Sequence, residues 1–462
     1  MGPHRRRALV IAYNFPPDAA IGTMRTLRVV QRLVDEGWDV AVLTSDPTTF
    51  RPGTPVDDAL LARVPAAVRV LRAPSIRPFE QLKRFVVKAV RGSAGSERAS
   101  SVPVGVSRPA KRKRGVVLRA VDAVDAALAI PDQESAWLLP AVSAGLRLFA
   151  TWRPDVIYST APPWTGQLVA RALALACRRP WVADFRDPWG RAPWRGDRFR
   201  FAVSAGAFLE ERIVRAADRI VFVTRANRED FVRQYGPMVA SKFHVVPNGC
   251  DPSEFERVAR PAGEPSEPFT LLHAGTLYAG RTPAPLFAAL RRGLDEGVIS
   301  PDRFRVRFLG TLGLASDLAA LTRELGIGDL VEFLPRVPRE QSIQAMVSAS
   351  ALLLLQPGHA VSIPGKLYEY FASGRPILSI AEEGEISALI RESGIGEAVT
   401  SDNEGEILDA LLRVMARAAT PVHPPPRALY DGGIGAANIV GILGAVACGD
   451  APPAAIGVGI QP

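Results

Sequence analysis

Two charged residues, Lys366 and Glu369, stand where a short helix is expected to begin, directly after Pro364-Gly365. They are three residues apart and therefore share one face of the helix. Proline suits the first helical position, and the free N–H groups of a helix N-terminus attract an anion. Lysine adds a point charge for phosphate, and the glutamate can accept hydrogen bonds from a ribose diol. The pattern predicts a nucleoside diphosphate site, and an ordinary surface helix is the simpler alternative.

A second charged group follows the apolar run that begins at Trp181. There, Asp184 and Asp187 flank Arg186. Such a density of charge is unfavourable inside a core, so these residues indicate a site at the carboxyl end of a strand. One of the two carboxylates could orient or deprotonate an acceptor hydroxyl. The alternative is a buried Asp–Arg pair that only holds the loop.

Alternating strands and helices are expected to position these groups. Ala351–Leu355 predicts a buried strand before the Lys366 helix, and Ile377–Ile380 predicts the strand after it. In open parallel sheets, ligands bind at the carboxyl ends of strands. Near the start, Ala8–Tyr13 and Asp39–Thr44 flank a helix in a βαβ unit. A nicotinamide or flavin enzyme would need three glycines in the first loop of this unit. The loop has only Gly22, so that class is disfavoured.

The stretch Ile363–Pro376 closely resembles the donor-nucleotide signature of GT-B glycosyltransferases, especially those of family 4. In that family, a Lys and a Glu in a PxKxxEYxAxGxP context grip the donor. Other stretches with the same likeness are Phe15–Arg25, Asp184–Trp189, Ala217–Thr224, Phe243–Asp251 and His273–Arg281. The resemblance implies an α/β fold of GT-B architecture, with two Rossmann-like domains facing across a cleft.

The resemblance also implies roles for particular residues. The residues expected to bind the donor are Gly22, Gly275, Arg281, Arg336, Val337, Gly365, Lys366, Leu367 and Glu369. Those expected to act in catalysis are Asp184, Asp187 and Glu369. Those expected to contact the acceptor or line the cleft are Arg25, Trp164, Arg186 and His359. Arg281 and Lys366 would carry the charge of the diphosphate between them, and Arg336 and Val337 would lie beside the base.

The sequence departs from the family pattern at three places. Many relatives have a lysine about five residues after the arginine, where this chain has Leu286. Most have a glutamate eight residues before Glu369, where this chain has Val361. Many also have a histidine in the region of Asp184, where this chain has none. The donor sugar and the residue that orients the acceptor are therefore not predicted.

The resemblance, together with composition shifts along the chain, implies four segments. Residues 1–256 form an N-terminal, acceptor-binding Rossmann-like domain with a basic insertion at about 75–130. Residues 257–268 are rich in Pro, Gly and Glu and form a linker. Residues 269–419 form a C-terminal Rossmann-like domain that binds the nucleotide-sugar donor. Residues 420–462 form a tail or helix that returns to the first domain.

The composition is that of an ordinary soluble globular protein, at 47% hydrophobic and 22% charged residues over 462 positions. Its three cysteines, Cys177, Cys250 and Cys448, form neither a disulfide framework nor a zinc spacing, which favours a reducing cytosol. The expected second domain has no Asp-x-Asp and no His/Cys/Asp cluster. This absence agrees with the resemblance, which implies that no metal is bound. No cofactor is expected either, because the nucleotide-sugar is a substrate.

The net charge of +9 comes from one segment of the chain. Phe79–Arg119 holds eleven Lys or Arg against two Glu, an excess of 11 − 2 = 9. A basic amphipathic helix followed by Lys111–Arg114 predicts binding to an anionic membrane surface. Nucleic acid is disfavoured because no nucleic-acid fold motif is present, and a solvated loop is the third reading. Gly432–Gly449 lacks charge for eighteen residues but holds six glycines, so a packed final helix is favoured over a membrane span.

Together these patterns predict a function. The resemblance implies a retaining, metal-independent transfer of a sugar from a UDP- or GDP-sugar to an acceptor hydroxyl. With the basic segment, the expected acceptor is a lipid-linked glycan in cell-surface polysaccharide synthesis. The expected location is cytoplasmic, peripheral at the inner face of the cytoplasmic membrane. The alternatives are a non-catalytic, membrane-associated nucleotide-sugar-binding protein, or another GT-B enzyme such as a nucleotide-sugar 2-epimerase.

Overall fold

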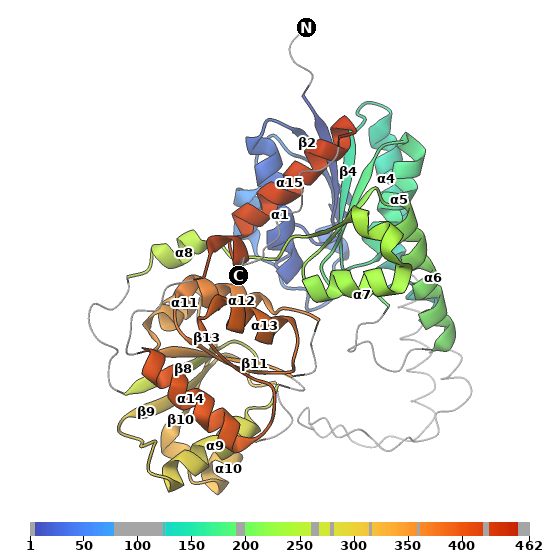
Figure 1. Ribbon diagram of the computed structural model, residues 1–462. Helices are drawn as coiled ribbons and strands as arrows, with labels where there is room; N and C mark the ends of the chain where they lie inside the picture. Colours follow the sequence, from blue (N-terminus) through green and yellow to red (C-terminus); the bar gives the residue numbers. More distant parts are fainter. Residues whose placement is uncertain are drawn as a thin grey trace, which may run out of the picture. The chain divides into compact units, whose positions relative to one another are not determined.

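The computed structural model describes residues 5–77, 123–124, 126–190, 199–259, 268–277, 281–313, 317–357, 361–418 and 425–450. Within these residues the chain divides into two compact units (Figure 1). The first unit contains the chain up to Pro247 and the last helix from Gly433. The second unit runs from Asn248 to Gly432.

The division after Pro247 differs from the boundary expected at 256. The short helix α8 (Pro252–Glu256) contacts helices of the second unit, and the buried Phe255 belongs to the second unit's core. Cys250 also forms a β-bridge with Asp431. Residues 248–256 therefore fold with the second unit. The expected linker, 257–268, lies mostly outside the described residues.

The first unit is built on a parallel sheet of seven described strands in the order β3-β2-β1-β4-β5-β6-β7. Its strands are β1 (Arg7–Ile11), β2 (Asp39–Ser45), β3 (Arg69–Ala73), β4 (Val156–Ala161), β5 (Trp181–Phe185), β6 (Arg219–Phe222) and β7 (Phe243–Val245). The strand order reverses direction between β1 and β4. In open α/β sheets such a switch point is where a ligand binds.

Helices cover both faces of this sheet. One face carries α1 (Ile21–Asp35) and α15 (Gly432–Cys448), so the final helix packs on the first unit. The other carries α4 (Leu138–Phe149), α5 (Thr165–Cys177), α6 (Arg200–Ala216) and α7 (Arg225–Tyr235). Strand β1 shows why both faces are apolar, because Ala8 and Val10 enter one core while Leu9 and Ile11 enter the other.

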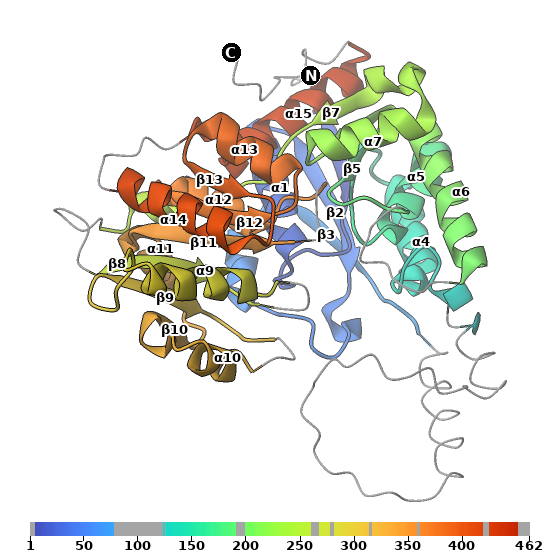
Figure 2. The same ribbon diagram turned by 60° about the horizontal axis from the view of Figure 1, so that its bottom comes forward.

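The second unit repeats this plan with a parallel sheet of six described strands, in the order β10-β9-β8-β11-β12-β13 (Figure 2). They are β8 (Phe269–Ala274), β9 (Phe304–Leu309), β10 (Val331–Leu334), β11 (Ala351–Gln356), β12 (Ile377–Ala381) and β13 (Gly396–Val399). Here the switch point lies between β8 and β11.

Two groups of helices bury the faces of the second sheet. Those that contribute to one core are α9 (Ala284–Asp295), α10 (Leu318–Glu324) and α14 (Glu404–Ala418). Those that contribute to the other, besides α8, are α11 (Arg339–Ser348), α12 (Gly365–Ser373) and α13 (Glu385–Ser393). In the part of the chain that the structure describes, no helix combines the length and apolar character that crossing a bilayer requires.

Candidate active site

Helix α12 follows β11 directly after the switch point of the second sheet. Its N-terminal residue Pro364 is extended and supplies no side-chain cap, and the helix ends at Gly374 with φ of +67°. Leu367 and Phe371 are buried in the core on the side that faces the sheet. This anchoring leaves Lys366 on another face, at the carboxyl edge of the sheet, beside backbone N–H groups that can receive an anion.

The ammonium group of Lys366 lies against the backbone of Gly275, the residue that follows β8. A Cβ added to Gly275 would be 1.1 Å from Lys366 Nζ, and Gly275 has φ of +138°, which side-chain-bearing residues rarely adopt. Gly310, after β9, packs behind it, since a Cβ there would be 2.5 Å from the Gly275 carbonyl oxygen. Two glycines from neighbouring strands thus make room for one cation.

Burial sets the charge state of this corner of the site. It lowers the pKa of Lys366 to about 8; Glu369 opposes this shift, while the positive charge of Arg281 adds to it. Arg281 is itself buried. Two cations close enough to depress a lysine pKa, next to an uncapped helix N-terminus, form a site for an anion of more than one charge.

A neutral histidine lies beneath these cations. His273 on β8 is buried, with Nδ1 3.0 Å from the carbonyl oxygen of Leu353. Burial, with Lys366 and Arg281 adding to it, lowers the pKa of His273 to about 3, so the ring stays neutral and Nδ1 donates. Tyr370 of α12 donates to the same carbonyl at 3.2 Å and accepts from the N–H of Ala274 at 3.1 Å. These bonds join β8, β11 and α12.

Glu369, one turn into α12, is held by an arginine. Arg339 at the start of α11 donates from Nη1 to Glu369 Oε1 at 2.8 Å and from Nε to Glu254 Oε2 at 2.9 Å. Burial lowers the pKa of Arg339, but the hydrogen bonds and charges of these two carboxylates outweigh burial and raise it. Nearby, Arg336 is exposed and Val337 is half-buried. Glu369 is therefore oriented before any ligand arrives.

In the first unit, Asp184 is the centre of a buried network at the end of β5. Arg25 of α1 donates to both of its carboxylate oxygens at 2.9 Å, and the hydroxyls of Tyr158 and Thr160 donate to Oδ2 at 2.8 Å each. Asp184 is fully buried. Burial, with the charge of Asp184 adding to it, raises the pKa of Tyr158. These contacts match a buried Asp–Arg pair that holds the loop.

Arg186 lies across the next turn of the same loop. Its Nε donates to the carbonyl of Ala161 at 3.3 Å, and its Nη2 bonds the carbonyl of Pro162. A Cβ on Gly22 would be 1.4 Å from Arg186 Nη1, so Gly22 provides the space that this guanidinium occupies. Burial lowers the pKa of Arg186, and the charges of Asp184 and Asp187 oppose the shift. Asp187 is half-buried, unlike Asp184.

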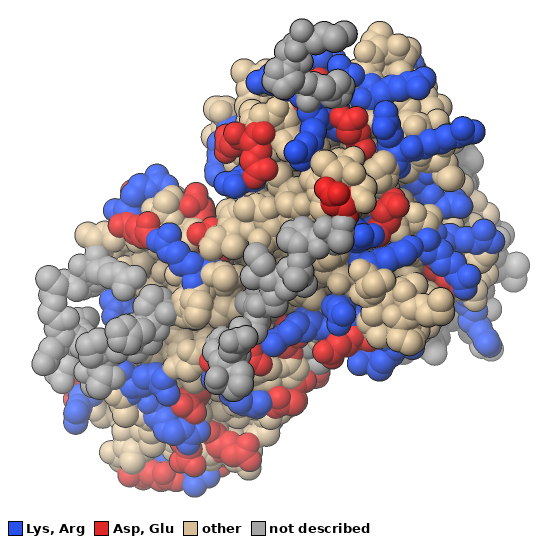
Figure 3. Space-filling view, turned by 45° about the horizontal axis from the view of Figure 1, so that its top comes forward, with Lys and Arg blue, Asp and Glu red and all other residues tan. Residues whose placement is uncertain are grey.

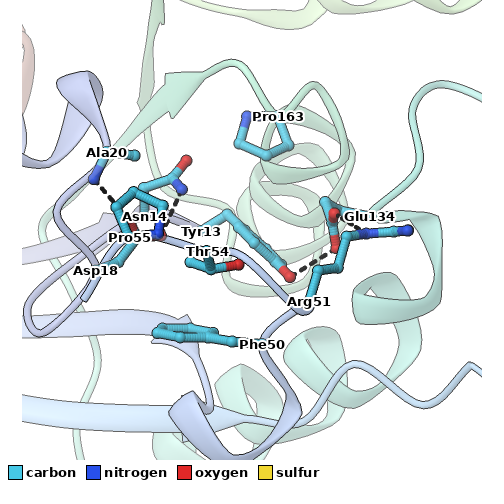
Figure 4. Close-up of a pocket in the computed structure, with 10 residues that line it drawn as sticks. All are labelled: Tyr13, Asn14, Asp18, Ala20, Phe50, Arg51, Thr54, Pro55, Glu134 and Pro163. Carbon is cyan, nitrogen blue, oxygen red and sulfur yellow. Dashed lines mark hydrogen bonds and ion pairs between the residues drawn. The ribbon is translucent and has the colours of Figure 1, made fainter. Parts of the chain in front are cut away.

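A cavity of about 200 Å³ opens at the carboxyl edge of the first sheet (Figure 4). Its polar end is Glu134, which accepts from the Tyr13 hydroxyl at 2.6 Å and from Arg51 Nε at 2.7 Å. Burial raises the pKa of Glu134, but Tyr13, Arg77 and Arg51 together lower it by more. The carboxylate of Glu134 is therefore ionised at neutral pH. At the other end, Asn14 Nδ2 donates to Asp18 at 2.7 Å. The lining thus offers both donors and acceptors.

Residues 102–254 match the model of Glycosyltransferase Family 4. Similar proteins include D-inositol 3-phosphate glycosyltransferases from Streptomyces bingchenggensis, 29% identical over 217 residues, and from Streptomyces scabiei, 31% identical over 229 residues. These alignments cover 45% and 47% of this chain and 47% and 50% of the relatives. The chain therefore spans about half the length of the relatives it matches.

Solved structures cover nearly the whole chain. Sucrose-phosphate synthase from Thermosynechococcus elongatus superposes with a TM-score of 0.56 at 15% identity, covering 96% of this chain and 97% of that one. Anabaena HepE in complex with UDP and glucose gives 0.54 at 13% identity, with 95% and 98% coverage. At such identities the likeness shows the fold. Residues 102–254 match glycosyltransferase family 4, and the chain has a GT-B fold.

The GT-B fold confirms the family resemblance and the fold class predicted from the sequence. Within residues 102–254, two site predictions do not fit the structure. Trp164 is only 2% exposed and stacks on Trp189 at 4.8 Å, so its side chain belongs to the core and not to an acceptor surface. The fully buried Asp184 likewise has its oxygens occupied. The side chain of Leu367 is buried in the core of the second unit and cannot contact a donor.

Arg25, predicted to line the cleft, is also buried and bound to Asp184, so its side chain holds the loop instead. The other predicted site residues keep their predicted roles as proposals. His359 lies outside the described residues. Sequence reasoning did not assign His273, Gly310 or Arg339 to the site, and it missed the partnership of Tyr13 with Glu134. The last could not be found from spacing, because 121 positions separate the two residues and only the folded sheet brings them together.

Proposed function

We propose that this protein is a retaining glycosyltransferase that transfers a sugar from a UDP- or GDP-sugar to an acceptor hydroxyl. The observation that carries the proposal is the position of the Lys366 ammonium against the backbone of Gly275. This position is beside Arg281 and the uncapped start of α12. This arrangement lies at the switch point of the second sheet, where α/β folds bind their ligands.

The chemistry asked of these residues is stabilisation of a leaving diphosphate. As the bond from the sugar to the diphosphate breaks, negative charge develops on the leaving oxygen, and Lys366, Arg281 and the α12 amides would oppose it. These cations supply the charge that a metal would otherwise provide. A bound diphosphate would raise the pKa of Lys366 from about 8, which favours its protonated form at neutral pH.

The remaining predicted donor contacts follow from this placement. Glu369, held by Arg339, would accept hydrogen bonds from the ribose diol with the oxygen that Arg339 leaves accessible. Arg336 and Val337, just before α11, would flank the base. Gly365 would contribute its backbone. The name of the relatives, D-inositol 3-phosphate glycosyltransferase, agrees with glycosyl transfer as the reaction class.

On the acceptor side, we propose a lipid-linked glycan in cell-surface polysaccharide synthesis. Asp187 is the accessible carboxylate of the loop after β5 and is our candidate for orienting the acceptor hydroxyl, with Arg25 and Asp184 holding the loop beneath it. The basic segment Phe79–Arg119 would attract an anionic membrane, and this attraction would hold the protein at the inner face of the cytoplasmic membrane. That segment lies outside the described residues.

The test is a thermal-shift panel of UDP, GDP, ADP and dTDP, followed by hydrolysis assays with the matching nucleotide-sugars. We expect one nucleoside diphosphate to raise the melting temperature, and its sugar derivatives to be hydrolysed slowly without acceptor. Binding without hydrolysis or transfer, even with membranes present, would instead indicate a non-catalytic nucleotide-sugar-binding protein. Turnover of UDP-GlcNAc to its 2-epimer without acceptor would indicate an epimerase.

A further inference from the structure

A second cavity, of about 170 Å³, lies in the first unit where α5 and α6 end. It is lined by Arg171, Arg178 and Arg179, with Leu175 and Trp181 among its apolar walls. Trp181 is the first residue of β5, so this cavity lies at the amino edge of the sheet, away from the loop that holds Asp184 and Asp187. No step of the proposed reaction uses it.

The three arginines around this cavity outnumber its one carboxylate, so the lining carries an excess of positive charge. None of these three arginines makes an ion pair with another described residue, and the Nε of Arg171 is buried without a hydrogen-bond partner there. The one acidic residue in the lining, Asp218, accepts a hydrogen bond from the Trp181 N–H at 2.8 Å. Three guanidinium groups around a small cavity favour an anion with several oxygens, such as a phosphate.

Arg178 occupies a position that costs the fold stability. It follows the end of α5 with φ of +51°, and among the described residues it alone combines a side chain with a positive φ. Glycine is the usual residue in this conformation because it has no Cβ. A backbone outlier of this kind is a reason to look for a role of the side chain.

Apolar side chains are exposed on the same two helices. Leu175 of α5 is 64% exposed, and α6 exposes Phe201 and Phe208 at 45% and 54%. The guanidinium of Arg212 lies 4.8 Å from the centre of the Phe208 ring. Helices α5 and α6 lie side by side on one face of the first sheet in both ribbon views (Figures 1 and 2). Exposed phenylalanines and arginines on neighbouring helices are what a membrane interface accommodates, with rings in the acyl boundary and cations at the headgroups.

We propose that this α5–α6 surface, defined by Arg171, Leu175, Arg178, Arg179, Phe208 and Arg212, docks on an anionic lipid bilayer and receives a lipid phosphate in the arginine cavity. This inference rests on the membrane association proposed above and names the surface that makes it. A second copy of the chain is a poor occupant, because an interface of the same surface with itself would bring like charges together. The segment Phe79–Arg119 is equally poor, since it carries the same sign of charge. Figure 3 shows Lys and Arg spread widely over the visible face of the first unit.

The experiment is co-sedimentation of the full chain with phosphatidylcholine vesicles, with and without phosphatidylglycerol. The key variant is Arg178→Gly, which removes a cation and relieves the backbone at once. We expect binding only when phosphatidylglycerol is present, and a fall of about fivefold in vesicle affinity for Arg178→Gly, from one lost basic contact. Its melting temperature should stay equal or rise, which separates lost binding from lost folding. Phe208→Ser should also weaken binding.

The matched control is Arg323→Gln, which removes an exposed arginine from α10 of the second unit. It should leave vesicle binding unchanged. Equal losses in Arg178→Gly and Arg323→Gln would mean that net charge alone drives binding and would overturn the proposal, as would a wild type that ignores anionic vesicles. A dimer that Phe208→Ser dissociates would assign the surface to a second copy. Nucleotide binding should be the same in all variants. Loss of vesicle binding alone would therefore leave the proposed donor site intact, and loss of nucleotide binding alone would leave the proposed membrane surface intact.

Discussion

The ammonium of Lys366 occupies the space that a side chain on Gly275 would fill, with only 1.1 Å between Lys366 Nζ and the position of a Cβ. The two residues are far apart in sequence and belong to α12 and the turn after β8. They meet because β8 and β11 are neighbours at the point where the strand order reverses. The glycine therefore fixes where the cation stands at the carboxyl edge of the sheet.

Gly275→Ala should remove nucleotide binding because the new methyl group would displace the Lys366 ammonium from its position at the site. The substitution also strains the backbone, at a cost of about 1–3 kcal/mol in unfolding free energy. The matched control is Gly297→Ala, since Gly297 also has a positive φ but a Cβ there meets nothing within 4 Å. Both variants should lose similar stability by chemical denaturation. Only Gly275→Ala should lose UDP or GDP affinity, by about tenfold or more, and equal losses would contradict the account.

The pKa of Lys366 predicts how nucleotide binding depends on pH. Because burial lowers this pKa to about 8, the ammonium is present at pH 7 and mostly lost by pH 9. Nucleoside diphosphate affinity should fall by about tenfold over that interval, and Lys366→Met should flatten the profile. His273, with a pKa of about 3, stays neutral throughout. A wild-type profile as flat as that of the variant would contradict the assignment.

The same shift has a consequence for stability without ligand. The folded protein releases the Lys366 proton near pH 8, whereas the unfolded chain keeps it to about 10.4. Between these values the unfolded state binds more protons, so the contribution of Lys366 to the free energy of unfolding should rise with pH. Comparing wild type with Lys366→Met by denaturation at pH 7 and 9.5 isolates that contribution. The difference in unfolding free energy between Lys366→Met and wild type should be larger at pH 7 than at pH 9.5. A difference that grows between pH 7 and pH 9.5 would contradict the prediction.

Asp184 and Arg25 should behave as a structural pair. Arg25→Met leaves a buried carboxylate with only hydroxyl partners, which should cost about 3–5 kcal/mol of unfolding free energy. Asp184→Asn should also destabilise, and the double variant should cost less than the sum of the two. Denaturant unfolding followed by tryptophan fluorescence measures all three. An Asp184→Asn protein as stable as wild type but without transfer activity would restore the catalytic role.

Arg339 should matter for the nucleotide more than for the fold. Its ion pair with Glu369 is largely exposed, so Arg339→Gln should change stability by less than about 1 kcal/mol. Without it Glu369 loses its fixed orientation, and nucleoside affinity should fall by about three- to tenfold. Arg391→Gln, which breaks the exposed pair with Glu383 in the same unit, is the control. Equal affinities in the two variants would show that Arg339 does not position Glu369.

Local sequence patterns predicted the elements of the fold well. Ala351–Leu355 and the Pro364-to-Gly374 stretch are β11 and α12 in the structure, because an apolar run, a proline and a glycine act within a few residues. The same patterns misplaced Trp164, since a tryptophan after a strand can as well enter the core as line a site. Stacking on Trp189 decided this, and pairing between loops is not visible in spacing.

The candidate site was predictable only in part, for the same reason. Lys366 and Glu369 share one helix face, so their proximity follows from helical geometry alone. The contact between Lys366 and Gly275 and the ion pair between Arg339 and Glu369 depend on strand order and on helix packing. Both bring together residues that are far apart in the chain. The carboxylates of the Asp184 loop looked alike in sequence. Asp184 is fully buried and Asp187 only half-buried, and this difference is not visible in spacing.

The most direct measurement is isothermal titration calorimetry of UDP and GDP, at pH 7, into wild type, Glu369→Ala, Gly275→Ala and Gly297→Ala. The account predicts one-site binding of one of the two nucleotides to wild type and Gly297→Ala, weakened in Glu369→Ala and lost in Gly275→Ala. Absence of heat with either nucleotide on folded wild type, or unchanged affinity in Gly275→Ala, would contradict the donor site and the proposed function with it.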